Sequence, residues 1–285
     1  MKRFLALLLA VLLLSGCGLQ GCFGPPTPPS KVEKAAPPEA VAPGTNAPAR
    51  DCVIAQVDGD ALLLYDEGGT LYTLALTGLL LTGQDESILS DDDLAAGQRV
   101  SVFFDGAVTL SNPAFFTEPT KLIVRGETTD LLGMYLNLFD ALWVEDAGLN
   151  DGISVLAFQF SDTFCGLPLA PPSTPAPAVA SQFALTQAQK NALLYILQHR
   201  YGYESFESDH DALLADGYIV KEENGFAHFP GGLLIELRIE EDYANGFRFS
   251  FSKWRSGLGA YIFTDCEATC ADGTWSYTIG PHAIA

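Results

Sequence analysis

Positive charge is scarce in this sequence. The 285 residues include 15 lysines and arginines against 35 aspartates and glutamates, which gives a formal charge of −20. A surface this acidic repels phosphate groups, so we expect no nucleic acid partner. The expected order of two helices and a hairpin over residues 186–237 resembles a winged helix, which is a nucleic-acid-binding arrangement. The acidic charge opposes nucleic acid binding by this segment.

The sequence also lacks the short motifs of common enzyme and metal sites. GxSxG, HExxH and GxxxxGK[ST] are absent, and no CxxC or HxxxH spacing offers a set of metal ligands. Asp91-Asp92-Asp93 lacks the ligand spacing of a calcium loop and is predicted to cap a helical turn. We therefore expect no metal and no cofactor, and we assign no catalytic residue.

The N-terminal apolar run is too short to span a membrane, which takes roughly 20 residues. It covers residues 4–14, follows Lys2 and Arg3, and leads directly into small residues before Cys17. This order predicts a signal peptide over residues 1–16. Residues 14–17, Leu-Ser-Gly-Cys, match the bacterial lipobox, in which the cysteine thiol is acylated with diacylglycerol and becomes the new N-terminus. The alternatives are an ordinary signal peptide cut elsewhere and lipidation of Cys22.

Lipidation predicts an extracytoplasmic protein that is anchored to a bacterial membrane. Residues 17–49 would comprise the lipidated Cys17 and a tether, with eight prolines in 24–49. Such a composition favours an extended chain, which would hold the folded part away from the membrane. Removing the signal peptide takes away Lys2 and Arg3 and no acid, so the formal charge becomes −22. The lipid alone, without a basic patch, is expected to hold the protein at an anionic membrane.

The six cysteines become an odd set of five once Cys17 is lipidated. Cys266 and Cys270 are expected on one strand, where four residues span about 13 Å. That separation exceeds the roughly 4.4–6.8 Å between the Cα atoms of a disulfide. Cys52 and Cys165 are the candidate bridge, and the alternative is that the thiols are free.

Residues 50–125 are predicted to form a small OB-like β-barrel domain. A turn at Asp58-Gly59 and a helical turn over 94–96 interrupt short strands, expected over 53–57, 61–65, 70–76, 99–104 and 121–125. OB barrels often bind oligomers. Arg99, Lys121 and Arg125 are too few to predict a basic groove.

Residues 126–285 are predicted to form an α+β domain with an antiparallel sheet. Apolar periodicity and caps indicate helices over 130–144 and 186–201 and a short one that ends at Ala215. Strands are expected over 153–160, 218–222, 233–240, 247–253, 259–266 and 275–279. Residues 167–181 hold five prolines and are predicted to be a loop insertion.

One stretch in the second domain is distinctive, because it gathers cations and aromatic rings in a chain with few cations. It contains Lys253, Trp254, Arg255 and Tyr261, with Gly257 and Gly259 between them. Arginine forks and aromatic faces bind anionic groups and sugars, so these four residues form the candidate ligand patch. The alternative is a strand turn whose glycines serve backbone geometry and whose Trp254 lies in the core.

The same stretch resembles a family. Residues 253–261, with 263–266 and 273–277, look like the C-terminal part of uncharacterised bacterial lipoproteins of Gram-positive type. Leu94, Gly97, Val100, Val102 and residues 111–113 are similar to small extracytoplasmic β-barrel domains. The resemblance implies export and two domains. It supplies no activity, and the insertion 167–181 departs from it.

These observations predict a lipid-anchored binding or scaffolding module at the cell envelope, with a cell-wall or protein partner. One alternative is an envelope hydrolase built from distant residues, such as His210 or His228 beside an acid or a serine. Another is a structural spacer or an immunity-type partner protein. The site geometry separates them, because a spacer needs no cleft and a hydrolase needs a nucleophile beside its base.

Acylation is testable by palmitate labelling in a producing bacterium. The wild-type chain should take up label and Cys17→Ala should not, because that thiol carries the diacylglycerol. Labelling that persists in Cys17→Ala and disappears in Cys22→Ala would place the anchor at Cys22 instead.

Overall fold

The structure is a computed structural model that describes residues 48–160 and 181–285. Cys17, the signal peptide and all but the last two residues of the predicted tether lie outside the described residues, as does the insertion 167–181 except for Ser181. Contacts join residues Pro43–Ala285 into one unit. No helix among the described residues is long and apolar enough to cross a membrane.

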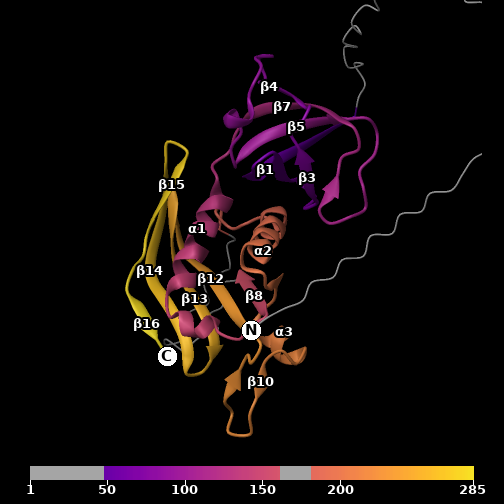
Figure 1. Ribbon diagram of the computed structural model, residues 1–285. Coiled ribbons are helices and arrows are strands. Elements are labelled where there is room, and N and C mark those ends of the chain that lie inside the picture. Colours follow the sequence, from indigo (N-terminus) through magenta and orange to yellow (C-terminus); the bar gives the residue numbers. More distant parts are fainter. Residues whose placement is uncertain (1–47, 161–180) are drawn as a thin grey trace, which may run out of the picture. The chain divides into compact units, whose positions relative to one another are not determined.

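The first sheet is a curled layer of seven strands (Figure 1). The strands are β1 (Ala49–Asp58), β2 (Ala61–Tyr65), β3 (Leu71–Ala75), β4 (Leu80–Thr82), β5 (Gln98–Phe104), β6 (Ala114–Phe115) and β7 (Pro119–Glu127). Their order is β4-β7-β5-β1-β2-β3-β6. The run β5-β1-β2-β3 is a Greek key, in which a fourth long strand returns beside the first. The predicted domain boundary after Arg125 falls two residues before the end of β7.

Alternating side chains build the core of this sheet. In β2, Leu62 and Leu64 are fully buried while the residues between them are half-buried. Val102 and Leu122 complete the same inner face from β5 and β7. The predicted turn after β1 is confirmed, since Gly59 has a φ of +58°, which favours glycine.

The predicted helical turn lies one turn earlier in the structure. A 3₁₀ turn covers Asp91–Asp93, not residues 94–96. Asp93 Oδ2 accepts from the backbone and hydroxyl of Ser90, both at 2.8 Å. Leu94 is already extended and buried, because its side chain belongs to the core of the first sheet. The prediction put the turn too late, since the capping residues themselves form it.

The second sheet contains nine strands, and it is mixed where an antiparallel sheet was expected. The strands are β8 (Val155–Phe160), β9 (Glu204–Glu207), β10 (Val220–Lys221), β11 (Ala227–His228), β12 (Gly232–Tyr243), β13 (Gly246–Ser256), β14 (Gly259–Ala271), β15 (Thr274–Thr278) and β16 (His282–Ile284). Strands β12 to β15 form an antiparallel meander, but β8 runs parallel to both β12 and β9. A helix crosses over between β8 and β9, as parallel pairing requires.

Helices cover both faces of the second sheet, so the protein is of the α+β class (Figure 1). Helices α1 (Leu131–Val144) and α2 (Gln187–Tyr201) pack on one face, and α3 (His210–Ala215) packs on the other. The predicted apolar face of α1 is confirmed, with these residues buried: Leu131, Leu132, Tyr135, Leu138, Phe139 and Leu142. A 3₁₀ turn, η2 (Ala147–Asn150), follows α1.

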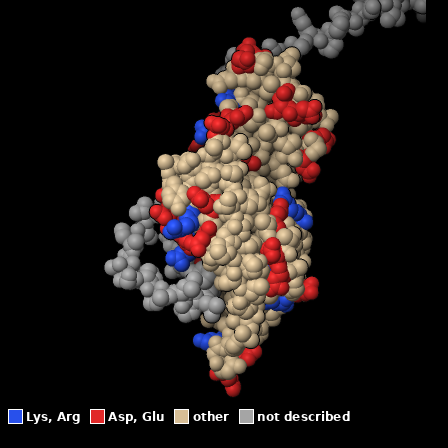
Figure 2. Space-filling view, turned by 90° about the vertical axis from the view of Figure 1, so that its left-hand side faces the viewer, with Lys and Arg blue, Asp and Glu red and all other residues tan. Residues whose placement is uncertain are grey.

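Acidic side chains cover more of the face shown in Figure 2 than basic ones do, and most of the few basic groups on it lie beside acidic ones. Ion pairs of this kind include Arg200 with Asp140 at 2.7 Å and Arg248 with Glu241 at 3.1 Å. Several cations of the chain are therefore neutralised by carboxylates.

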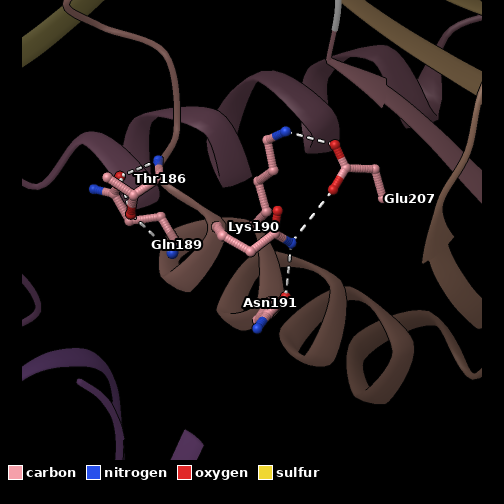
Figure 3. Close-up of polar contacts among 6 residues, drawn as sticks. Thr186, Gln189, Lys190, Asn191 and Glu207 are labelled. Carbon is pink, nitrogen blue, oxygen red and sulfur yellow. Dashed lines mark hydrogen bonds and ion pairs between the residues drawn. The ribbon is translucent and has the colours of Figure 1, made fainter. Parts of the chain in front are cut away.

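The N-terminal end of α2 is fixed by polar contacts (Figure 3). Thr186 and Gln189 form the predicted capping box, in which the Thr186 hydroxyl accepts from the Gln189 backbone at 3.3 Å. Lys190 pairs with Glu207 of β9 at 2.5 Å. On the other side, Asn191 Nδ2 donates to the Gly69 carbonyl at 2.9 Å. The helix is thereby tied both to its own sheet and to the first sheet.

We expect Thr186→Ala to lower the free energy of unfolding by about 1 kcal/mol, because an N-terminal amide of α2 loses its acceptor. Urea unfolding of the full mature chain measures this as a lower midpoint. Thr77→Ala, at an exposed turn position, is the matched control and should leave the midpoint unchanged. Equal midpoints for the two variants would contradict the role of the cap.

Candidate functional site

The predicted ligand patch does not form an open surface. Lys253 and Arg255 lie on β13 and face α1 and η2, while Trp254 lies on the opposite face of the sheet beside α3. Tyr261 of β14 is the cross-strand partner of Lys253. Strand alternation thus separates Trp254 from the other three residues.

Lys253 is an internal cap for α1. Its side chain is 0 % exposed, and its Nζ donates to the carbonyls of Glu145 and Trp143 and, at 3.0 Å, to Asn150 Oδ1. The end of a helix leaves carbonyl groups without intrahelical donors, and a cation there is favoured by the helix dipole. Burial lowers the pKa of Lys253 to about 8, although the carboxylates of Asp146 and Glu145 oppose this shift.

Arg255 and Tyr261 bind the same region of the chain. Arg255 Nη1 donates to the carbonyls of Leu149 at 3.1 Å and Asp151 at 2.7 Å, and Tyr261 Oη donates to Glu145 Oε2 at 3.1 Å. The polar groups that were expected to meet a ligand are used within the protein. The prediction of a ligand patch at Lys253, Trp254, Arg255 and Tyr261 is corrected accordingly: Lys253, Arg255 and Tyr261 hold α1 and η2 on the sheet, and Trp254 packs beside α3 on the opposite face.

The histidines lie in separate places. His199 packs against Tyr195 with tilted rings, and His210 meets the Trp254 ring edge-to-face. His228 lies 3.9 Å from Glu222, and His282 stacks on Tyr261. Within residues 48–160 and 181–285 no serine hydroxyl is hydrogen-bonded to a histidine, and no group of His, Cys, Asp and Glu could hold a metal ion. The geometry of the described histidines does not favour the hydrolase alternative.

The described cysteines form no disulfide with one another. Cys266 and Cys270 both lie on β14 and are not bridged to each other, as predicted from their spacing. Cys52 is buried in the core of the first sheet. Cys165 lies outside the described residues, so its pairing with Cys52 stays a prediction. Burial raises the pKa of Cys52 to about 12, which disfavours a nucleophilic thiolate.

A cleft of about 870 Å³ lies between the first sheet and the N-terminal part of α2. Its walls come from β1, β5 and β7, from Thr128 and Thr129 before α1, and from residues 182–189. Pockets of this size hold small molecules. Its charged lining residues are Asp51, Asp66, Glu67, Arg99 and Arg125.

A chain of three side chains positions one arginine at this cleft. Ser101, only 2 % exposed, donates its hydroxyl to Asp51 Oδ1 at 2.5 Å. Arg125 Nε then donates to the same hydroxyl oxygen at 3.0 Å. The three residues lie on the adjacent strands β1, β5 and β7. The guanidinium is therefore oriented by a hydroxyl group, and no carboxylate of the described residues pairs with it directly.

Asp66 is a buried acid in the same lining, 8 % exposed. Its carboxylate accepts from Tyr72 Oη at 2.7 Å and from the Thr70 amide at 2.9 Å, and Arg50 lies 3.7 Å away. Burial, together with the hydrogen bond to Asp66, raises the pKa of Tyr72 to about 12. Both carboxylate oxygens of Asp66 thus accept hydrogen bonds from donors within the protein.

Arg99 is the second cation of the cleft. It is exposed, and its cross-strand partner on β7 is Gly126, next to Arg125. No ion pair or hydrogen bond of its side chain occurs with the residues that the structure describes. The small number of cations in the sequence predicts no basic groove at Arg99 and Arg125. The signal that identifies them as a pair is their placement on two neighbouring strands.

No protein-family model matches this sequence, and no curated protein matches it. The resemblance to uncharacterised lipoproteins therefore stays a prediction. Function has to be argued from the geometry of the cleft.

Lys253→Met should lower the free energy of unfolding by about 1–3 kcal/mol at neutral pH, because two buried helix carbonyls lose their donor. The folded-state pKa of Lys253 lies below its ordinary value of 10.5, so the unfolded chain binds more protons between about pH 8 and pH 10.5. Wild-type stability should thus rise through this window relative to the variant.

Urea unfolding at about pH 7 and about pH 9.5 measures both effects. The matched control is Lys221→Met, which removes an exposed lysine of β10. A difference between wild type and Lys253→Met that is the same at both pH values would rule out the shifted pKa.

Proposed function

We propose that this protein is a lipid-anchored extracytoplasmic binding module that holds a small ligand in the cleft between the first sheet and α2. Anchoring is supported by the lipobox at residues 14–17, and the length of the tether by its prolines. The binding role is supported by the volume of the cleft and by its mixed polar and apolar walls. A spacer needs no such cleft, so the cleft favours binding over that alternative.

One observation carries the binding role: Arg125 is preoriented at the cleft by Ser101 and Asp51. A surface arginine usually gains little from being fixed, because ordering a long side chain opposes the contact. A fixed guanidinium without a carboxylate partner is instead suited to a ligand, since the ordering has already occurred before binding. The cleft therefore contains a polar group that is already positioned to contact a ligand.

The first sheet fits the OB-like barrel of this proposal. Its five longest strands follow the order β7-β5-β1-β2-β3, and β4 continues the chain just after β3. Because β4 pairs in parallel with β7, the chain segment after β3 reaches the far end of the sheet and draws it into a curl.

Blocking the cleft should abolish ligand binding. Thr129 is exposed, lines the cleft and has no side-chain hydrogen bond with the described residues, so Thr129→Trp adds bulk without removing a contact. Thermal-shift measurements on the full mature chain in detergent would use a panel of N-acetylated dipeptides, amino sugars and sugar acids. At least one compound should stabilise the wild type and leave Thr129→Trp unshifted.

Thr77→Trp is the matched control, because it puts the same ring on an exposed turn away from the cleft. It should respond to the ligand as the wild type does. A compound that stabilises Thr129→Trp as strongly as the wild type binds elsewhere and would count against the cleft as the site.

A further inference from the structure

Some of the charged side chains that line the cleft are already hydrogen-bonded within the protein, and others have atoms free to contact a ligand. Asp51 is bound by Ser101, and Asp66 is bound by Tyr72 and lies beside Arg50. Both guanidinium groups keep donors for a ligand, since only Nε of Arg125 is used among the described contacts. Glu67 is an exposed acid at the same cleft. The groups left to meet a ligand are therefore the two arginines, Glu67 and the second carboxylate oxygen of the exposed Asp51.

The strand register places the two arginines together. Arg99 pairs with Gly126, and a bulge between Arg99 and Val100 puts Arg125 next to that pair. Side chains on adjacent strands of one face lie within reach of each other, and two like charges there repel. An anion bound between the two guanidiniums would remove this repulsion and use donors that are otherwise turned to water.

On this basis we infer that the ligand of the cleft carries a carboxylate, which Arg99 and Arg125 bind together. This inference rests on the proposed binding function. Guanidinium groups match a carboxylate with two parallel hydrogen bonds. Three acids and two arginines leave the charged lining with a net charge of −1, which opposes a doubly charged phosphate more than a singly charged carboxylate.

The carboxylate has two chemical sources that suit the rest of the lining. Hydroxyl and amide side chains, such as Thr129 and Gln189, can meet either the amides of a short peptide or the hydroxyls of a sugar acid. The shared chemistry is a monoanionic carboxylate on a small polar molecule. The two sources are separated by the probes in the experiment.

The test is isothermal titration of the full mature chain with pairs of probes in which the carboxylate of one member is replaced by a neutral polar group in the other. One pair is N-acetyl-alanyl-alanine and its C-terminal amide, and the other is methyl glucuronide and methyl glucoside. In at least one pair the acid should bind about tenfold or more tightly than its neutral partner, as expected for charge-assisted hydrogen bonds. The pair that responds identifies the source, and glycerol phosphate should bind more weakly than the acid.

Variants assign the contact to the two arginines. Arg99→Gln and Arg125→Gln should each weaken binding of the acid by about tenfold and leave the neutral probe unchanged. Arg238→Gln, a variant of an arginine on β12 outside the cleft lining, is the matched control and should bind as the wild type does. Ser101→Ala should weaken binding only when Arg125 is present, because Ser101 is a positioning residue.

The outcomes separate this inference from the proposed function. Acid and neutral probes that bind equally, and are both blocked in Thr129→Trp, would leave the cleft as a binding site and overturn the carboxylate. Tighter binding of glycerol phosphate would overturn it too. If no probe of the wider panel binds the wild type, the proposed function itself is wrong.

Discussion

The packing of α1 depends on one buried ammonium group. Lys253 lies beneath the C-terminal end of the helix and supplies donors to carbonyls that would otherwise be buried without partners. The other end of α1 begins at Leu131, which lines the cleft. A rigid helix of 14 residues thus connects the lysine cap to one wall of the candidate site. Loosening the cap would loosen that wall, although Lys253 touches no ligand.

Local signals made much of the fold predictable. The Thr186–Gln189 capping box starts α2 where the sequence indicates, and Gly273, with a φ of +78°, makes the turn between β14 and β15. The failures are elements that depend on partners far along the chain. Strands β9 and β11 are short and were missed, and the parallel pairing of β8 with β12 joins residues about 80 positions apart, which no local pattern encodes.

The candidate site was misplaced for a related physical reason. Lys253 and Arg255 were predicted to bind a ligand because cations are rare in this chain. A cation is also a suitable donor for buried carbonyl groups, and both residues donate to backbone carbonyls in the structure. The residues of the cleft meet only through strand register. Asp51, Ser101 and Arg125 are distant in sequence and carry no common motif. Their contact follows from the order β1-β5-β7, so it can be read only from the sheet.

What distinguishes Arg125 is the kind of partner that it has. Arg200 and Arg248 contact carboxylates directly, so each ion pair attracts an additional anion only weakly. A hydroxyl orients Arg125 without cancelling its charge. The acidic surface repels an approaching anion, but this long-range effect is screened within about 8–10 Å at physiological ionic strength. The contact inside the cleft is short-ranged and survives such screening, so affinity and selectivity for an anion would arise from the two arginines and not from the net charge of the chain.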